Sequence, residues 1–255
     1  GFWRVPGAFN DVAHKNGVQT GCTYFIDWGA GVNAQNEPGK TLFELATPGS
    51  NSYGDKYKYS RKLIQFLKYY GIDGICFNPE GTWGYAVYSR FIPFLAECHK
   101  IAKELGHPFH VDWYAFVTNA GQLSDDGCKL SSNSSNWFHY TPNQQNGNVA
   151  ALNGQPVTDV YFLNYNWTEA GLATSASKAK ELGRSTFDVY AGFDMQGRGY
   201  GKNGNAGWTA LMSQPVSVVV WGAHDRNQLY ISSTEGGQSD YAVQNEYQKK
   251  QEMLF

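Results

Sequence analysis

Six apolar, strand-like runs recur along this chain, and most of them are separated by segments with helical periodicity. In the segment 59–70, for example, Leu63, Phe66, Leu67 and Tyr70 recur at three- and four-residue spacing, which predicts a helix. Regular alternation of strands and helices predicts a parallel sheet joined by right-handed crossovers. The predicted strands are 18–27, 73–78, 110–117, 159–164, 187–194 and 216–222, and the predicted helices are 5–16, 59–70, 85–105, 175–182 and 241–254.

Polar or aromatic side chains follow the end of each predicted strand. Because the carboxyl ends of barrel strands converge on one face, this pattern favours a (β/α)8 TIM barrel over a doubly wound sheet. Two further strands are then expected, one ahead of Gly1, so that the barrel is incomplete at its N-terminus, and one after Gly222. We expect residues 1–255 to form one barrel domain. The Gly-rich loop 28–57 is predicted to lie over the functional face.

Composition points to a neutral polar ligand. The formal charge is −2 without a Lys/Arg run, which argues against a nucleic-acid partner or an anionic membrane surface. No apolar run reaches the length of a membrane span. The chain has eight Trp and 17 Tyr, more than a core of this size needs. Aromatic rings stack on sugar faces while Asn, Gln and Ser bond hydroxyls, so a carbohydrate ligand is favoured.

Four cysteines, Cys22, Cys76, Cys98 and Cys128, show no paired spacing, and we predict buried free thiols. Because Cys-x-x-Cys and His-x-x-x-His are absent, we expect no zinc site. Phosphate-binding glycine motifs in the right context and a Gly-x-Ser-x-Gly elbow are absent too. We therefore expect no metal and no cofactor, and a monomeric protein.

The segment 73–80, Asp-Gly-Ile-Cys-Phe-Asn-Pro-Glu, is the strongest candidate for catalysis. Alternate side chains of a strand share a face, so Cys76, Asn78 and Glu80 are predicted to point the same way. Pro79 cannot donate to a sheet ladder, and the strand is expected to end there. An amide and a carboxyl would thus lie two residues apart at the C-terminal end of a strand, where barrels hold catalytic groups.

Other candidates are aromatic or acidic residues near strand ends. Trp167, between Asn166 and Thr168, is predicted to be a surface platform for a ligand, and Trp83, flanked by glycines, to line the cleft. For Trp113 a core ring and a substrate contact are equally supported. Asp194 is compatible with a substrate contact or with a loop-fixing acceptor. Trp221 ends the last predicted strand and completes the candidate substrate-binding set.

These residues resemble glycoside hydrolase family 85, the endo-β-N-acetylglucosaminidases that cut the N,N'-diacetylchitobiose core of N-glycans. The resemblance covers most of the barrel region, and its segments occur in the family's order. Two features depart from the family pattern: an insert at 131–153, and the absence of the first strand, which would precede Gly1. The resembling segments are 14–18, 73–80, 113–114, 162–167, 187–194 and 197–199.

The resemblance implies substrate-assisted retention, in which the sugar's own acetamido oxygen attacks the anomeric carbon and forms an oxazolinium. Glu80 would be the general acid and then the base, and Asn78 would hold the acetamide. Tyr114 is expected to be a hydrogen-bond partner near the acetamide. Asn164, Tyr165 and Trp167 are expected to bind sugar.

The segment 73–80 is also similar to the Asp-Gly-x-Asp-x-Asp-x-Glu of family 18 chitinases, with Cys76 and Asn78 in place of the inner aspartates. That substitution favours family 85. A chitin-directed hydrolase and a non-catalytic carbohydrate-binding barrel remain alternatives, although a binding protein would not need both Asn78 and Glu80. Because N-glycoproteins lie mostly outside the cell, a secreted, extracellular or cell-surface location is expected.

Overall fold

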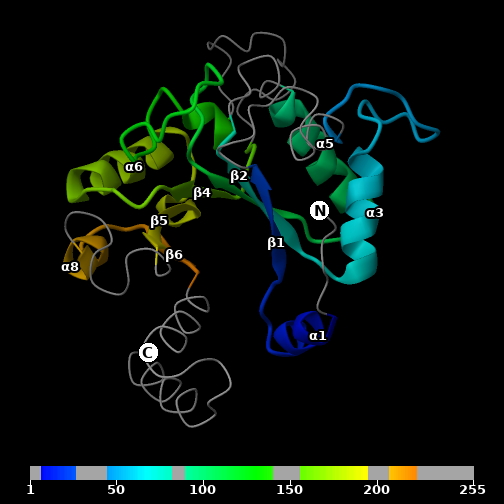
Figure 1. Ribbon diagram of the computed structural model, residues 1–255, viewed down its shortest axis with the longest axis horizontal. Helices are drawn as coiled ribbons and strands as arrows, with labels where there is room; N and C mark the ends of the chain where they lie inside the picture. Colours follow the sequence, from blue (N-terminus) through cyan, green and yellow to red (C-terminus); the bar gives the residue numbers. More distant parts are fainter. Residues whose placement is uncertain (1–6, 27–44, 82–89, 140–155, 195–206, 223–255) are drawn as a thin grey trace, which may run out of the picture.

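The computed structural model describes residues 7–26, 45–81, 90–139, 156–194 and 207–222 (Figure 1). Six strands in these ranges form one parallel sheet, and each strand lies beside the one that precedes it in sequence. This is the connectivity of a (β/α)8 barrel, and all six predicted strands are confirmed. The strand expected after Gly222 and the helix expected at 241–254 lie outside the described residues. The strands are β1 (Gly21–Ile26), β2 (Gly74–Pro79), β3 (His110–Tyr114), β4 (Val160–Leu163), β5 (Val189–Asp194) and β6 (Ser217–Trp221).

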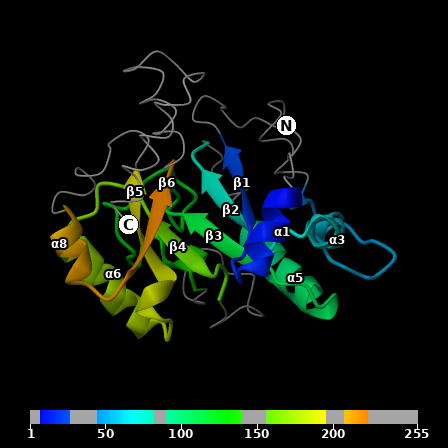
Figure 2. The same cartoon turned by 90° about the horizontal axis from the view of Figure 1, so that it is seen from below.

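The first α-helix precedes β1, and the later α-helices connect successive strands and flank the curved sheet (Figure 2). One of them, α6, begins six residues earlier than predicted because Thr168 caps it: the Thr168 hydroxyl accepts a hydrogen bond from the Gly171 N–H at 3.0 Å. The short helix α8 and the 3-10 turns η1 and η3 were not predicted. The helical elements are α1 (Gly7–Lys15), α3 (Ser60–Tyr70), α5 (Phe91–Glu104), η1 (Ser135–Trp137), α6 (Glu169–Glu181), η3 (Thr186–Asp188) and α8 (Gly207–Met212).

Alternate strand residues face two different cores. On the helix-covered face, Phe77 packs its ring against Phe91 of α5, with 6.1 Å between centroids. On the opposite face, Cys76 joins a smaller cluster built around Tyr114, Val160 and Phe162, on β3 and β4. The predicted alternation along β2 is therefore confirmed, and the second face is the interior of the barrel.

The crossover from β3 to β4 has no α-helix in its described part, and aromatic residues near η1 cover the sheet instead. Trp137 stacks on Trp113 with 4.1 Å between ring centroids and 1° between planes, and Phe138 packs on Tyr161 at 5.8 Å. Arg184 holds this segment by donating a 2.7 Å hydrogen bond to the Phe138 carbonyl. The described part of the predicted insert, 131–139, thus belongs to the packed outer layer.

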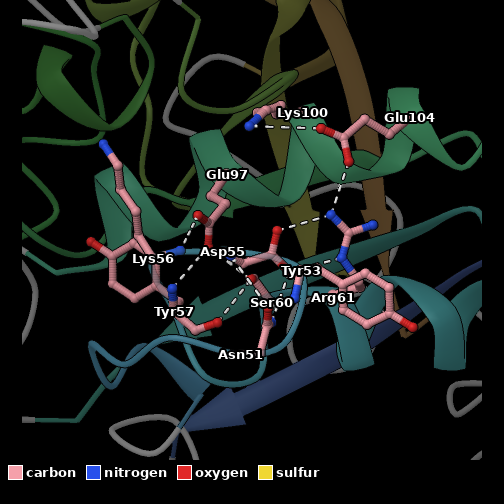
Figure 3. Close-up of polar contacts among 10 residues, drawn as sticks. All are labelled: Asn51, Tyr53, Asp55, Lys56, Tyr57, Ser60, Arg61, Glu97, Lys100 and Glu104. Atoms are coloured by element: carbon pink, nitrogen blue, oxygen red, sulfur yellow. Dashed lines mark hydrogen bonds and ion pairs between the residues drawn. The ribbon is translucent and has the colours of Figure 1, made fainter.

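The described part of the loop expected over the functional face packs instead against α5 (Figure 3). The Glu97 carboxylate on α5 accepts hydrogen bonds from the backbone N–H groups of Lys56 (2.6 Å) and Tyr57 (3.0 Å). Asp55 receives two bonds from Arg61, at 2.8 and 2.9 Å. These hydrogen bonds hold the pKa of Asp55 below its ordinary value. This polar network fixes the loop to the outer helices.

Candidate active site

The predicted amide and carboxyl lie at the C-terminal end of β2. Asn78 is buried, 8% exposed, and lies in register with Phe25 of β1. Glu80 is half-buried, and its backbone N–H donates to the Asn78 carbonyl oxygen at 3.2 Å. The side-chain oxygen Oδ1 of Asn78 is buried and accepts no hydrogen bond from the residues that the structure describes. A buried acceptor of this kind is costly, so it is well suited to accept from an incoming ligand N–H.

Tyr114 ends the neighbouring strand β3 and is buried among three aromatic rings. Phe116 lies parallel to it with 5.8 Å between centroids, Phe162 meets it edge-on at 5.0 Å, and Tyr165 lies at 5.9 Å. Burial raises the pKa of the Tyr114 hydroxyl far above its ordinary value, and the nearby Tyr165 and Glu80 raise it further. Tyr114 therefore stays protonated and can donate a hydrogen bond near the Glu80 carboxyl.

The next strand ends supply further polar groups. Asn164 is buried after β4, where its Oδ1 accepts from the Tyr165 N–H at 2.6 Å, so its side-chain NH2 is directed away from that bond. Asp194 and Trp221 are register partners at the ends of β5 and β6, and both are half-buried. The structure thus gathers these candidates at one end of the sheet, and their contact with substrate stays a prediction.

Two tryptophans of the predicted substrate-binding set lie in the outer core instead. The prediction of a surface platform at Trp167 is wrong: its ring is fully buried, packs on Phe193 at 5.6 Å, and donates from Nε1 to the Gly192 carbonyl at 2.9 Å. Trp113 alternates with Tyr114, so it faces away from the barrel interior and stacks on Trp137. Trp83 lies outside the described residues.

Sequence reasoning missed the residues that surround Tyr114. Phe162 and Tyr190 share its face of the sheet, and strict alternation from Asn164 and Asp194 could have found them. Asp125 lies near it as well, because the chain folds back after β3: the Ser124 N–H donates to the Phe116 carbonyl at 3.0 Å. No local sequence pattern predicts that the chain folds back after β3.

A cavity of about 260 Å³ lies at the opposite end of the sheet. It is lined by residues at the N-terminal ends of β1, β2 and β3, among them Thr20, Asp73, His110 and Asp112. His14 and the Thr20 N–H both contact the Asp73 carboxylate at 2.7 Å, which ties the start of β1 to that of β2. Because barrel chemistry belongs to the C-terminal strand ends, we assign this cavity a structural role.

None of the four cysteines forms a disulfide, as predicted. Cys98 and Cys128 are buried as expected, whereas Cys22 and Cys76 are half-buried. Burial raises the pKa of the Cys22 thiol to about 12, so it stays protonated and unreactive. Among the described residues, no group of three or more His, Cys, Asp or Glu side chains is placed to hold a metal ion. None of the described helices is long and apolar enough to span a membrane.

A parallel barrel that holds an amide and a carboxyl at the C-terminal end of one strand, beside a protonated tyrosine, has its polar groups where barrel enzymes carry their active sites. The chain belongs to glycosyl hydrolase family 85, whose family model matches residues 5–252. The family resemblance inferred from the sequence is thereby confirmed.

The chain is also similar to curated endo-β-N-acetylglucosaminidases. It is 25% identical to cytosolic endo-beta-N-acetylglucosaminidase 1 of Arabidopsis thaliana over 248 residues, 95% of this chain and 31% of the relative. Identity to the cytosolic endo-beta-N-acetylglucosaminidase of Danio rerio is 27%, over 76% of this chain and 23% of the relative. The chain thus spans less than a third of the length of these relatives. Because these proteins are named cytosolic, the expected extracellular or cell-surface location is wrong.

A solved structure supports the fold. The glycoside hydrolase domain of Endo-D from Streptococcus pneumoniae R6 superposes with a TM-score of 0.69 at 21% sequence identity. The match covers 94% of this chain and 39% of that chain. It confirms the barrel architecture.

Proposed function

We propose that this protein is a retaining endo-β-N-acetylglucosaminidase that hydrolyses the N,N'-diacetylchitobiose core of N-linked glycans. Family membership and the names of the relatives support this activity class. The observation that carries it is the pair at the end of β2, where Asn78 lies two residues from Glu80 and its buried Oδ1 accepts no hydrogen bond from the described part of the chain. An acetamido group offers the N–H that this oxygen requires.

The reaction is substrate-assisted. The acetamido carbonyl oxygen attacks the anomeric carbon of its own sugar while Glu80 gives its proton to the departing glycosidic oxygen. Asn78 accepts the acetamide N–H, where positive charge grows as the oxazolinium forms. Glu80, now a carboxylate, then takes a proton from a water molecule. The water oxygen attacks the anomeric carbon, which opens the oxazolinium ring and restores the acetamido group. Two displacements at one carbon retain its configuration.

Tyr114 supports the same step as a hydrogen-bond donor near the acetamide. Burial raises the pKa of its hydroxyl, which therefore stays protonated at neutral pH and can donate a hydrogen bond. Asn164, Asp194 and Trp221, on the following strand ends, are proposed to contact the sugar. The amide of Asn78 cannot act as a nucleophile, which argues against a two-carboxylate double displacement at this pair.

The test is incubation with a high-mannose glycoprotein followed by mass spectrometry of the protein product. Release of the glycan with one GlcNAc left on asparagine supports the proposal. Binding without release would instead support a carbohydrate-binding barrel. Cleavage of chitin oligosaccharides but not of the glycoprotein would point to a chitin-directed hydrolase. Glu80→Gln is the matched control, since it keeps the size of the side chain and removes the acid.

We infer that the protein works in the cytosol. The relatives are named cytosolic, and none of the four cysteines forms a disulfide, which is compatible with a reducing compartment. Localisation of a fluorescently tagged full-length protein in its own cells tests this inference.

A further inference from the structure

Gly192, in the middle of β5, has no room for a side chain. A Cβ at this position would lie 2.5 Å from the Leu163 carbonyl oxygen, 2.7 Å from Cε2 of Phe162 and 2.9 Å from Cδ1 of Tyr165. All three distances are shorter than real Cβ contacts, and one of the atoms belongs to the backbone of β4. Glycine is therefore required at position 192 because there is no room for a side chain, and not because the backbone angle is unusual.

The two rings that occupy this space also hold Tyr114. Phe162 meets the Tyr114 ring edge-on at 5.0 Å, Tyr165 meets it at 5.9 Å, and the two touch each other at 5.8 Å. The three rings form a closed triangle on the interior side of β3 and β4. Because buried rings pack at near-crystalline density, moving two of them displaces the third.

The peptide of Gly192 is fixed from the other side of the sheet. Trp167, which is fully buried in the outer core against Phe193, donates its indole N–H to the Gly192 carbonyl at 2.9 Å. The strand cannot easily move away from the rings without losing this hydrogen bond. A side chain at position 192 would therefore push on Phe162 and Tyr165.

We propose that Gly192 is a positioning residue of the active site: its lack of a side chain admits the rings of Phe162 and Tyr165, which orient Tyr114 beside Glu80. This inference rests on the proposed function for its kinetic consequence. Gly192 acts through the ring triangle.

Gly192→Ala tests the proposal, with Gly74→Ala as the matched control. A Cβ on Gly74 would lie 2.3 Å from the His110 carbonyl, an equally severe clash, but at the N-terminal end of β2 and β3. Both variants are assayed with a high-mannose glycopeptide at a temperature where circular dichroism shows them folded. Crystal structures of the wild type and both variants give the distances between the three ring centroids.

We expect Gly192→Ala to lengthen the distance from Tyr114 to at least one of its two rings and to lower kcat by about 10- to 100-fold, as small misplacements of catalytic groups do. KM should change by less than about threefold, because the added methyl group acts on the rings that orient Tyr114 and, of the residues expected to bind sugar, displaces Tyr165 alone. Gly74→Ala should lose stability, with kcat within about twofold of the wild type per folded molecule. An unmoved ring triangle, an unchanged kcat in Gly192→Ala, or an equal loss in Gly74→Ala would overturn the proposal.

Phe162→Leu provides a second test if Gly192→Ala does not fold. It removes one ring of the triangle without adding an atom, and it should likewise lower kcat more than it raises KM. A wild-type protein that releases no glycan would refute the proposed function. The ring distances in the variants would still decide whether Gly192 orients Tyr114.

Discussion

The backbone N–H of Glu80 donates to the carbonyl oxygen of Asn78 at 3.2 Å, so the two proposed catalytic residues belong to one tight turn at the end of β2. Pro79 between them has a fixed backbone angle and no N–H to give to the sheet. The separation of the amide from the carboxyl is therefore set by the backbone, and a substitution of either side chain should leave the other in place.

Glu80→Gln should lower turnover of a natural N-glycan by at least ~100-fold, the usual scale for loss of a general acid. The amide keeps the size and polarity of the side chain, so glycan binding should persist. Initial rates and isothermal titration with the same glycopeptide check both statements. Glu181→Gln, on the exposed face of α6, is the control and should be fully active. A near wild-type rate in Glu80→Gln would remove Glu80 from the mechanism.

Trp167→Ala should destabilise the protein by about 3–5 kcal/mol, the usual loss for a fully buried large aromatic ring. Trp167→Phe keeps most of the packing and loses only the hydrogen bond to Gly192, so its loss should be smaller. Urea denaturation measures both. Tyr69→Ala, whose ring is 80% exposed, is the control and should change stability by no more than about 0.5 kcal/mol. Unchanged stability with weakened glycan binding in Trp167→Ala would restore the surface-platform interpretation.

Asp55→Asn should lower the melting temperature at neutral pH, by about 2–8 °C if the paired charge contributes about 1–2 kcal/mol in a domain of this size. Arg61 lowers the pKa of Asp55, so the charged carboxylate stabilises the folded state. This contribution of the Asp55 carboxylate to the free energy of unfolding is fully present above the ordinary carboxyl pKa. It is lost as the pH falls through the lowered pKa of Asp55 in the folded protein. The difference in melting temperature between the wild type and Asp55→Asn should therefore be constant near neutral pH and should shrink at acidic pH.

Thermal melts between neutral pH and about pH 3 check this behaviour. Asp11→Asn, on α1, is the control. A difference that grows as the pH falls would show that the Asp55 carboxylate does not stabilise the fold through its charge.

Local pattern was sufficient for the strands and for the pair at the end of β2. Apolar runs mark buried parallel strands, and the two-residue repeat of a strand places Asn78 on the same face as Cys76. The positions of Trp113 and Trp167 depend on partners that are distant in sequence. Trp113 stacks on Trp137, 24 residues later, and Trp167 bonds to Gly192, 25 residues later. A tryptophan after a strand looks the same whether it meets a sugar or a neighbouring strand.

The start of α6 and the packing of 131–139 were missed for similar reasons. Thr168 is an N-cap only because the chain turns there, and the Ser- and Asn-rich run before Trp137 has the composition of a polar loop. In the fold, Asn136 is fully buried beside the Trp113–Trp137 stack. Composition alone does not reveal that this run packs against the outer face of the sheet through the stack of Trp137 on Trp113.

The most direct test of the proposed mechanism is the Asn78→Ala variant supplied with a preformed glycan oxazoline and a GlcNAc acceptor. If Asn78 acts only in oxazolinium formation, this variant should fail to hydrolyse the glycan and still transfer the sugar, since Glu80 remains as base. The product should persist because its cleavage is blocked, whereas Glu80→Ala should use the oxazoline far less well. Equal inactivity of both variants toward the oxazoline, or full glycan hydrolysis by Asn78→Ala, would contradict the mechanism.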